Sequence, residues 1–168
     1  MHIYDDSTAR RTIWQVQINW KRQLTFSKRQ VNFIKTKIPK ARGVYCIYAK
    51  YHKFKFSSPD WPTDRWSRVV YIGSGWLRGR LCAHLTYEKN NLLAQYLEKY
   101  ELAYRFDRIV EAEVVDWPKT VEAYLLREFE DKFGALPCAN RRRETIPDLP
   151  LDKFIVKQSP NFDFLARR

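Results

Sequence analysis

The amino-acid sequence predicts an α+β domain in which a small antiparallel β-sheet of about three core strands is covered by helices. Three runs rich in β-branched and aromatic residues, 43–49, 68–75 and 103–116, have the composition of strands. Apolar residues recur at helical spacing directly after the second of these runs and again over 92–100 and 120–133. The resulting order is strand, strand, helix, helix, strand, helix, which is typical of a layered α+β domain.

The segment before the first of these strands has a weaker pattern. Apolar and polar side chains alternate over 12–26, which predicts one or two strands with a solvent-facing side. Ser27 has the right chemistry to cap a short helix that runs through Ile34. Pro39 then favours an extended approach to the first core strand.

Glycines punctuate the first two core strands. Gly43 begins the first strand, and the pair Gly73 and Gly75 ends the second and lets the chain turn. In the helix that follows, Arg80 and His84 lie four residues apart and therefore share one face. The stretch from Gly43 to His84 is thus expected to bring polar side chains from two strands and a helix into one neighbourhood.

The last helix and the tail have clear boundaries. Gly134 tolerates a positive φ and is expected to end the helix over 120–133. The run Arg141–Arg143 then opens a tail that contains several prolines, and such a tail is extended. It could wrap the domain, join a partner chain or lie on DNA. The arginines could contact phosphate, and a solvated run of charge is the alternative.

The charge of the chain indicates its class of partner. A net charge of +12 over 168 residues favours a polyanion. No run is long and apolar enough to span a bilayer and no signal-peptide pattern opens the chain, so nucleic acid is favoured over a membrane. A basic surface that serves only solubility is the alternative. The three cysteines form no CxxC pair, which gives no basis for a disulfide framework or a zinc site and favours a reducing, cytoplasmic setting.

A polar and aromatic insert at 50–67 separates the first two core strands. Its basic residues are interleaved with aromatic ones, a combination that suits neutralisation of a phosphate backbone together with base stacking. Packing of these aromatics on the domain itself is the alternative. The basic residues of interest are Lys53, Lys55 and Arg65.

Three short motifs resemble those of the GIY-YIG nuclease family. Gly43-Val44-Tyr45 stands where the family has GIY, Tyr71-Ile72-Gly73 is a literal YIG, and the RxxxH that follows in many members is matched from Arg80 to His84. The resemblance covers about 38–143. Ser74, directly after YIG, is similar to the residue found in homing and stand-alone types, whereas some repair members have lysine there.

The resemblance implies a fold and a set of roles. It implies a sheet of GIY-YIG type and hydrolysis of DNA with Mg²⁺ or Mn²⁺. Tyr45 and Tyr71 would face the site from adjacent strands, and one of them would orient or deprotonate the attacking water. Arg80 would contact the scissile phosphate, and His84 would assist proton transfer or hold a phosphate.

The acid that would hold the metal ion is expected in the helix over 120–133. Glu122, Glu128 and Glu130 all lie there, and because the helix is apolar on more than one side, periodicity does not choose among them. The resemblance selects Glu128, which follows an LLxE-like pattern and precedes Asn140 by twelve residues. Glu128 would then bind the metal and Asn140 would brace the site.

These features together predict a metal-dependent endonuclease that hydrolyses phosphodiester bonds, with double-stranded DNA as the expected substrate. We divide the chain into an N-terminal extension (1–37), a nuclease core (38–143) and a C-terminal arm (144–168). The residues expected to bind substrate are Arg78, Lys53, Lys55, Arg65, Arg141 and Arg142. Cutting both strands needs two sites, which favours a homodimer or transient pairing.

Two other functions fit the same residues. One is a nucleic-acid-binding module on a nuclease scaffold that no longer cuts, although such a module would be expected to have lost part of the motif set. The other is an RNA nuclease, because phosphate contacts form with either polymer.

Overall fold

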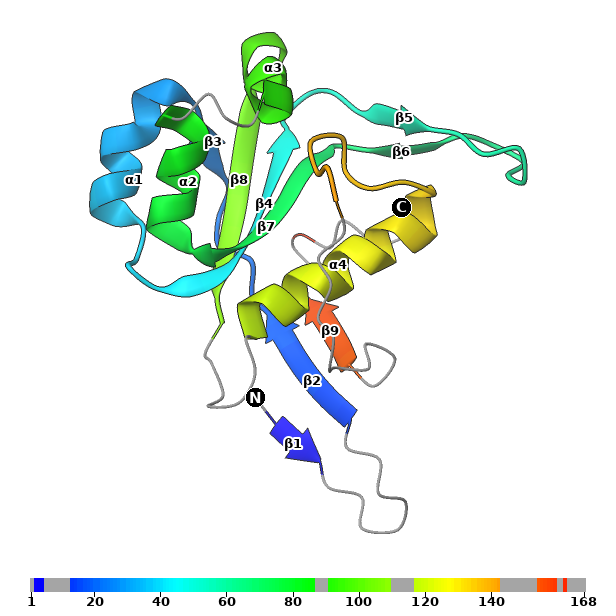
Figure 1. Cartoon of the computed structure of the whole chain (residues 1–168), viewed down its shortest axis with the longest axis horizontal. Coiled ribbons are helices and arrows are strands. Elements are labelled where there is room, and N and C mark those ends of the chain that lie inside the picture. Colours follow the sequence, from blue (N-terminus) through cyan, green and yellow to red (C-terminus); the bar gives the residue numbers. More distant parts are fainter. Residues whose placement is uncertain are drawn as a thin grey trace.

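The structure, a computed structural model, describes residues 2–4, 13–86, 91–109, 117–142, 154–159 and 162. Its centre is a four-stranded antiparallel sheet of order β3-β8-β4-β7 (Figure 1). The strands are β3 (Leu24–Phe26), β4 (Arg42–Ala49), β7 (Val69–Trp76) and β8 (Leu102–Arg108). The predicted α+β class with a small antiparallel sheet is confirmed. The sheet has one strand more than the three expected because β3, from the N-terminal extension, pairs with β8.

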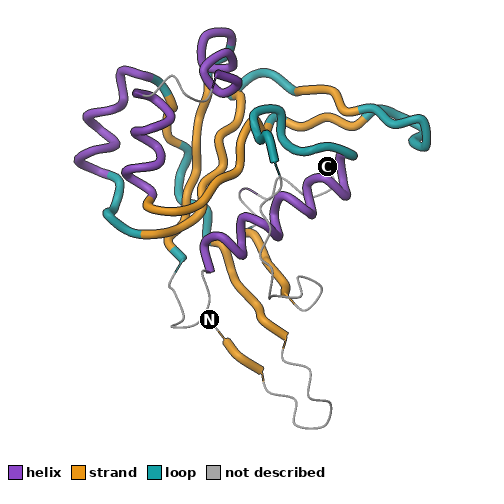
Figure 2. Tube along the Cα trace, in the orientation of Figure 1, coloured by secondary structure: helices purple, strands orange, loops and turns teal. Residues whose placement is uncertain are grey.

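Helices cover both faces of this sheet. The helices α1 (Val31–Lys37) and α2 (Leu77–Thr86) lie against one face, and α4 (Trp117–Phe133) crosses the other (Figures 1 and 2). The short α3 (Asn91–Lys99) joins the α1–α2 side through buried Leu93. None of the helices in the described part of the chain is long and apolar enough to cross a bilayer.

Alternate residues of β4 enter two separate cores. Val44 and Cys46 join the apolar cluster beneath α4, whereas Tyr45 and Ile47 join the cluster beneath α1 and α2. Successive side chains of a strand point to opposite faces, so a strand that is covered on both sides is apolar throughout. This alternation decides which side chains of the two motif strands meet which helix.

The two ends of the chain form a second sheet. β2 (Ile13–Ile18) pairs antiparallel with β1 (His2–Tyr4) and parallel with β9 (Phe154–Gln158). Beyond this sheet, the Trp20 indole donates to Gln158 Oε1 at 2.8 Å and the Phe162 ring lies 4.7 Å from that of Tyr48. Of the three possibilities for the tail, β9 therefore takes the first, because it wraps its own domain. Arg143 and residues 144–153 lie outside the described residues.

The insert forms a hairpin of β5 (Phe54–Phe56) and β6 (Arg65–Ser67). Packing on the domain, one of the two alternatives for its aromatics, is seen for Phe56, whereas a role of the insert in base stacking stays a prediction. Phe56 is buried against Phe129 and Phe133 of α4, whereas Trp66 is 54% exposed. The hairpin is thus attached to the domain on one side and open to solvent on the other.

Two local expectations need correction. Ser27 makes no side-chain capping bond, because the chain enters α1 through a 3₁₀ turn over Lys28–Gln30. The helix expected from Thr120 begins three residues earlier, at Trp117, and Gly134 ends it with a φ of 73° as expected. The third core strand ends at Arg108, and residues 110–116 lie outside the described residues.

Gly43 lies where the backbone of β8 comes too close for any side chain. A Cβ added at Gly43 would overlap the carbonyl oxygen of Asp107 and lie 3.1 Å from the Cα of Arg108. Because both neighbours are main-chain atoms of a paired strand, they could move only if the β4–β8 ladder shifted.

We expect Gly43→Ala to lower the free energy of unfolding by about 2 kcal/mol or more, because it forces this overlap. Gly79→Ala is the matched control, since a Cβ there meets nothing within 4 Å and the residue lies inside α2. This second substitution should raise the free energy of unfolding by about 0.5–1 kcal/mol. Urea unfolding of both variants checks the pair, and equal effects of the two would contradict the close approach.

Candidate functional site

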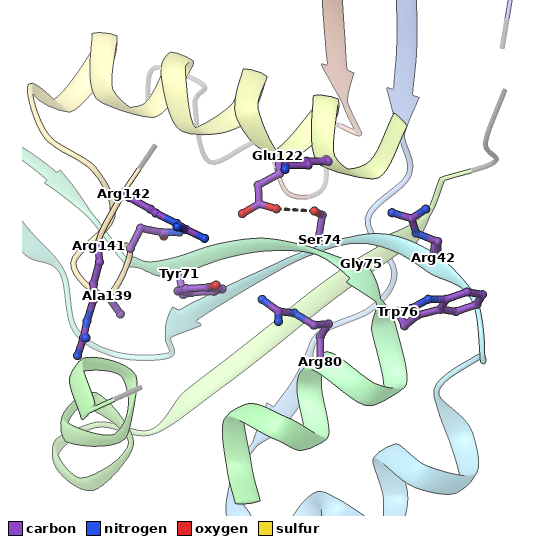
Figure 3. A pocket seen from close by; sticks show the side chains of 12 residues that line it. Arg42, Tyr71, Ser74, Gly75, Trp76, Arg80, Glu122, Ala139, Arg141 and Arg142 are labelled. Atoms are coloured by element: carbon purple, nitrogen blue, oxygen red, sulfur yellow. Dashed lines mark hydrogen bonds between the residues drawn. The ribbon is translucent and has the colours of Figure 1, made fainter. Parts of the chain in front are cut away.

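A pocket of about 490 Å³ opens at the free edge of β7 (Figure 3). Its walls come from both layers of the domain. In Figure 3, Glu122 and Ser74 lie on the α4 side of the strand, and Tyr71 and Arg80 lie on the α2 side. The residues that line it are Arg42, Tyr71, Ser74, Gly75, Trp76, Arg80, Lys119, Glu122, Ala139, Asn140, Arg141 and Arg142.

Gly73 fixes the two motif tyrosines relative to one another. Tyr45 of β4 stands directly opposite Gly73 of β7, so both face the same side of the sheet. A Cβ at Gly73 would lie 2.5 Å from the Tyr45 hydroxyl and 2.7 Å from Cε1 of Tyr71. The absent side chain therefore leaves the space that the Tyr45 phenol occupies, with Tyr71 packed beside it.

The aromatic rings continue into α2 through His84. The Tyr45 hydroxyl and His84 Nε2 lie 2.7 Å apart and share a hydrogen bond. The Tyr71 ring lies 4.9 Å from the imidazole and stacks on that of Tyr45 at 6.1 Å. Tyr45 is 0% exposed, whereas Tyr71 is only half-buried and lines the pocket. Of the two phenols, Tyr71 is therefore the one that a ligand in the pocket can touch.

Burial sets the protonation state of this group. Burial raises the pKa of Tyr45 well above its usual range, and Arg80 offsets only part of the effect. The pKa of Tyr71 is raised by burial first and by the charge of Glu122 second, again against Arg80. Burial, followed by the Arg80 charge, lowers the pKa of His84 to about 4. At neutral pH both phenols therefore keep their protons and the imidazole is uncharged.

Arg80 reaches the pocket over a glycine. Gly75 has a φ of +118°, and a Cβ there would lie 3.4 Å from Cγ of Arg80. The side chain of Arg80 thus passes over the end of β7, with its guanidinium beside Tyr45 and Tyr71, whose interactions raise its own pKa. Arg80 and His84 share a face of α2 as the sequence predicted, and both meet the motif tyrosines.

Asn140 closes the edge of β7. Its Nδ2 donates to the Ile72 carbonyl at 2.8 Å, and its Oδ1 accepts from the Ile72 amide at 3.0 Å. The Ala139 amide also donates to the Val70 carbonyl at 2.8 Å. An edge strand otherwise presents unpaired main-chain groups, so this segment takes the place of the next strand. Asn140 therefore holds the edge of β7 through two hydrogen bonds, and its role in a reaction stays a prediction.

The acid that the structure brings to the pocket is Glu122, whereas Glu128 does not line it. Glu122 is 7% exposed, and its carboxylate accepts a hydrogen bond from the Ser74 hydroxyl. Glu128 is partly exposed and pairs with Arg127 at 3.7 Å. Six residues of α-helix separate the two acids by about 9 Å along the axis and turn them about 120° apart. The expectation that Glu128 joins the tyrosines in one pocket is thus corrected in favour of Glu122.

Arg141 and Arg142 line the pocket, and their role in binding substrate stays a prediction. Arg78, on the same helix as Arg80, does not line it. Its Nε donates to the Ile38 carbonyl at 2.7 Å, which ties the start of α2 to the end of α1.

The basic residues of the insert also lie outside the pocket. Arg65 lies over the Trp61 ring at 4.0 Å, and Lys55 pairs with Asp64 at 3.5 Å. Lys53 is exposed just before β5. A role for these three in binding a longer polymer stays a prediction.

Pocket residues that were not predicted to take part in the site include Arg42, Ser74, Trp76 and Lys119, and Glu122 was one of three acids left open by the helix pattern. Arg42 and Trp76 are cross-strand partners, a relation that follows only from the register. Ser74 and Glu122 meet across the two layers of the fold. In the sequence Trp76 is marked only as a large aromatic next to Gly75, and its exposure at the pocket follows from the fold.

Charge in the pocket is strongly unbalanced. Its lining holds five cationic side chains and one acidic one, Glu122. Within the described ranges, no cluster of three or more His, Cys, Asp or Glu side chains is arranged to hold a metal ion. A single carboxylate beside a hydroxyl fits Mg²⁺, which keeps several waters and completes its shell with phosphate oxygens. The donor set therefore suits a cation that arrives together with a phosphorylated ligand.

Comparison of the chain with family models, curated proteins and solved structures found no match. The resemblance to the GIY-YIG family consequently stands on the motif residues themselves.

The neutral His84 predicts a pH-dependent stability. Its folded pKa of about 4 lies below its ordinary value of 6.5, so the unfolded chain takes up a proton between these values that the folded chain does not. The free energy of unfolding should therefore fall by up to about 3 kcal/mol as the pH drops from 6.5 to 4. His84→Gln keeps a polar group there without titration and should lose this component. Urea unfolding from pH 7 to 4.5 checks it, and a constant difference between the two proteins would contradict the burial of His84.

Proposed function

We propose that this protein is an endonuclease of GIY-YIG type that hydrolyses DNA phosphodiester bonds with Mg²⁺ or Mn²⁺. The observation that carries the proposal is the pocket at the edge of β7. There the phenol of one motif and the arginine of another line a strongly cationic cavity that holds one buried carboxylate. Each alone has a structural explanation, and their convergence on one cavity supports chemistry on a phosphate.

The cationic side chains bind the scissile phosphate. Arg80, Arg141 and Arg142 come from α2 and from the segment after α4, so they approach the cavity from different elements. Guanidinium groups bind phosphate oxygens in a bidentate manner and stabilise charge that develops on them. Arg80 is held in place over Gly75 and is the one that contacts the reacting phosphate.

Tyr71 contacts the attacking water, and Tyr45 and His84 act behind it. Tyr71 keeps its proton at neutral pH because its pKa is raised, so its hydroxyl orients the water by hydrogen bonding. Tyr45 is fully buried and holds His84 through the 2.7 Å hydrogen bond. The neutral imidazole stands at the end of this row of phenols, hydrogen-bonded to Tyr45. Tyr45 and His84 are therefore positioning residues, whereas Tyr71 is catalytic.

Glu122 and the Ser74 hydroxyl would hold the divalent cation. The cation would neutralise phosphate charge and lower the pKa of a bound water. Asn140 keeps β7 in register, which holds Tyr71 and Ser74 at fixed positions on the two sides of the strand. A pair of such molecules would be needed to cut both strands of a duplex.

Replacing Glu122 and Glu128 separately tests the choice of acid. With Mg²⁺ and supercoiled plasmid, we expect Glu122→Gln to lower the cleavage rate by about 10²-fold or more. Losses of this size are typical when one preorganised group that stabilises charge in the transition state is removed. Glu128→Gln should change the rate by less than about two-fold, because its side chain lies on another side of α4. EDTA should abolish cleavage by the unmodified chain.

Several outcomes would overturn the proposal. Cleavage that survives both EDTA and Glu122→Gln would contradict a mechanism in which Glu122 holds a divalent cation. Tight binding of DNA without cleavage would favour the binding-module alternative. Faster cleavage of RNA than of DNA in the same assay would favour the RNA nuclease.

Replacing each motif tyrosine tests their division of roles. Tyr71→Phe should lower kcat by about 10- to 100-fold with little change in substrate affinity, because it removes a hydrogen bond to the water. Tyr45→Phe should cost less activity but should lower the free energy of unfolding by about 1 kcal/mol, because it leaves His84 unpaired in a buried site. Single-turnover cleavage and urea unfolding check both, and an exchange of the two phenotypes would contradict the assignment.

A further inference from the structure

Trp76 is a large exposed aromatic at the mouth of the pocket. Its side chain is 62% exposed, and it is the last residue of β7. Tyr51, Trp66 and Ile155 are the other exposed large hydrophobics in the described part of the chain, and of the four only Trp76 lines the pocket. A single exposed aromatic is common on protein surfaces, but Trp76 is distinguished by its position in the lining of the cationic pocket.

Trp76 lies beside one cationic residue, Arg42, at one end of the pocket. Trp76 pairs across the ladder with Arg42, which also lines the pocket. Ser74, two residues earlier, shares its face of the strand and binds Glu122. Figure 3 shows Trp76 and Arg42 together at one end of the cavity, with Arg141 and Arg142 at the other.

The spacing fits a nucleotide next to the reacting phosphate. Two residues of extended strand place the Cα of Trp76 roughly 7 Å from that of Ser74. One nucleotide with its base can span this interval. A phosphate held by Arg80 near Ser74 would therefore put the neighbouring base within reach of the indole, while Arg42 meets the next phosphate.

We propose that the Trp76 indole stacks on the base of an unpaired nucleotide that adjoins the phosphate bound at Arg80. The site consequently prefers single-stranded or locally unpaired DNA over a continuous duplex. Stacking on an aromatic ring requires a free base face, which a base within a duplex does not offer until it leaves the stack. This proposal rests on the proposed function because it needs a nucleic-acid strand bound in the pocket. It does not need that strand to be cut.

Binding measurements in a Glu122→Gln background, where the probe stays intact, test this assignment. Three fluorescent probes are compared, each in the presence of Mg²⁺. The first is a single strand of eight thymine nucleotides, the second is a strand of the same length in which every unit is abasic, and the third is a duplex of equal length. The added substitutions are Trp76→Ala, Trp76→Phe and, as the matched exposed indole outside the pocket, Trp66→Ala.

We expect Trp76→Ala to weaken binding of the thymine strand by about 5- to 150-fold, the range for loss of one base–aromatic stack. Trp76→Phe should recover most of this loss, and Trp66→Ala should change binding by less than about two-fold. On the abasic strand and the duplex, Trp76→Ala should have little effect. Equal weakening by Trp76→Ala on all three probes would overturn the proposal.

Plasmid and single-strand cleavage by the protein without these substitutions separates the two proposals. If Trp76→Ala weakens binding of the thymine strand but not of the abasic strand, and the protein without substitutions cleaves neither substrate, the nuclease proposal is refuted and the stacking role of Trp76 is supported. If the protein cleaves DNA but Trp76→Ala weakens binding of the thymine and abasic strands equally, the nuclease proposal is supported and the stacking role of Trp76 is refuted.

Discussion

The close packing of the Tyr45 ring on Gly73 is the constraint on which the candidate site depends. The ladder places the two residues opposite one another, and the phenol occupies the space that any other residue at Gly73 would fill. This contact buries Tyr45 completely, brings its hydroxyl to His84 and leaves Tyr71 as the phenol that reaches the pocket. The glycines of both motifs thus have a packing reason in this chain, since Gly43 in turn admits the backbone of β8.

The second constraint is that β7 is an edge strand. Because no further strand among the described residues covers it, side chains from both faces can meet around its edge, and Asn140 satisfies the main chain of Ile72 in place of a neighbour. The α2 layer contributes Arg80, and the α4 layer contributes Glu122. A site built around a strand edge in this way draws on both layers of the domain, while its groups stay fixed by the sheet.

The sequence was a good guide where the determinants are local. The start of the first strand near Gly43 and the shared helical face of Arg80 and His84 follow from spacing within one stretch, and the structure has both. The second strand does not end at Gly73 and Gly75 as expected, because both glycines pair with β4 and the strand runs on to Trp76. The choice of Glu128, which the resemblance suggested, was wrong as a pocket residue. The helix pattern left Glu122, Glu128 and Glu130 open because α4 is apolar on several sides. Which side faces β7 is decided by packing between layers, so only the fold reveals Glu122. Trp76 was missed for the same reason, since its pairing with Arg42 is a long-range contact.

Anomalous diffraction from crystals grown with Mn²⁺ and a short oligonucleotide would test the central claim most directly. We expect one ordered Mn²⁺ bound to the Glu122 carboxylate, at a distance near the roughly 2.1 Å typical of small divalent cations, with a phosphate between it and Arg80. A metal peak at Glu128, or an oligonucleotide bound away from the edge of β7, would contradict a reactive site built around this strand.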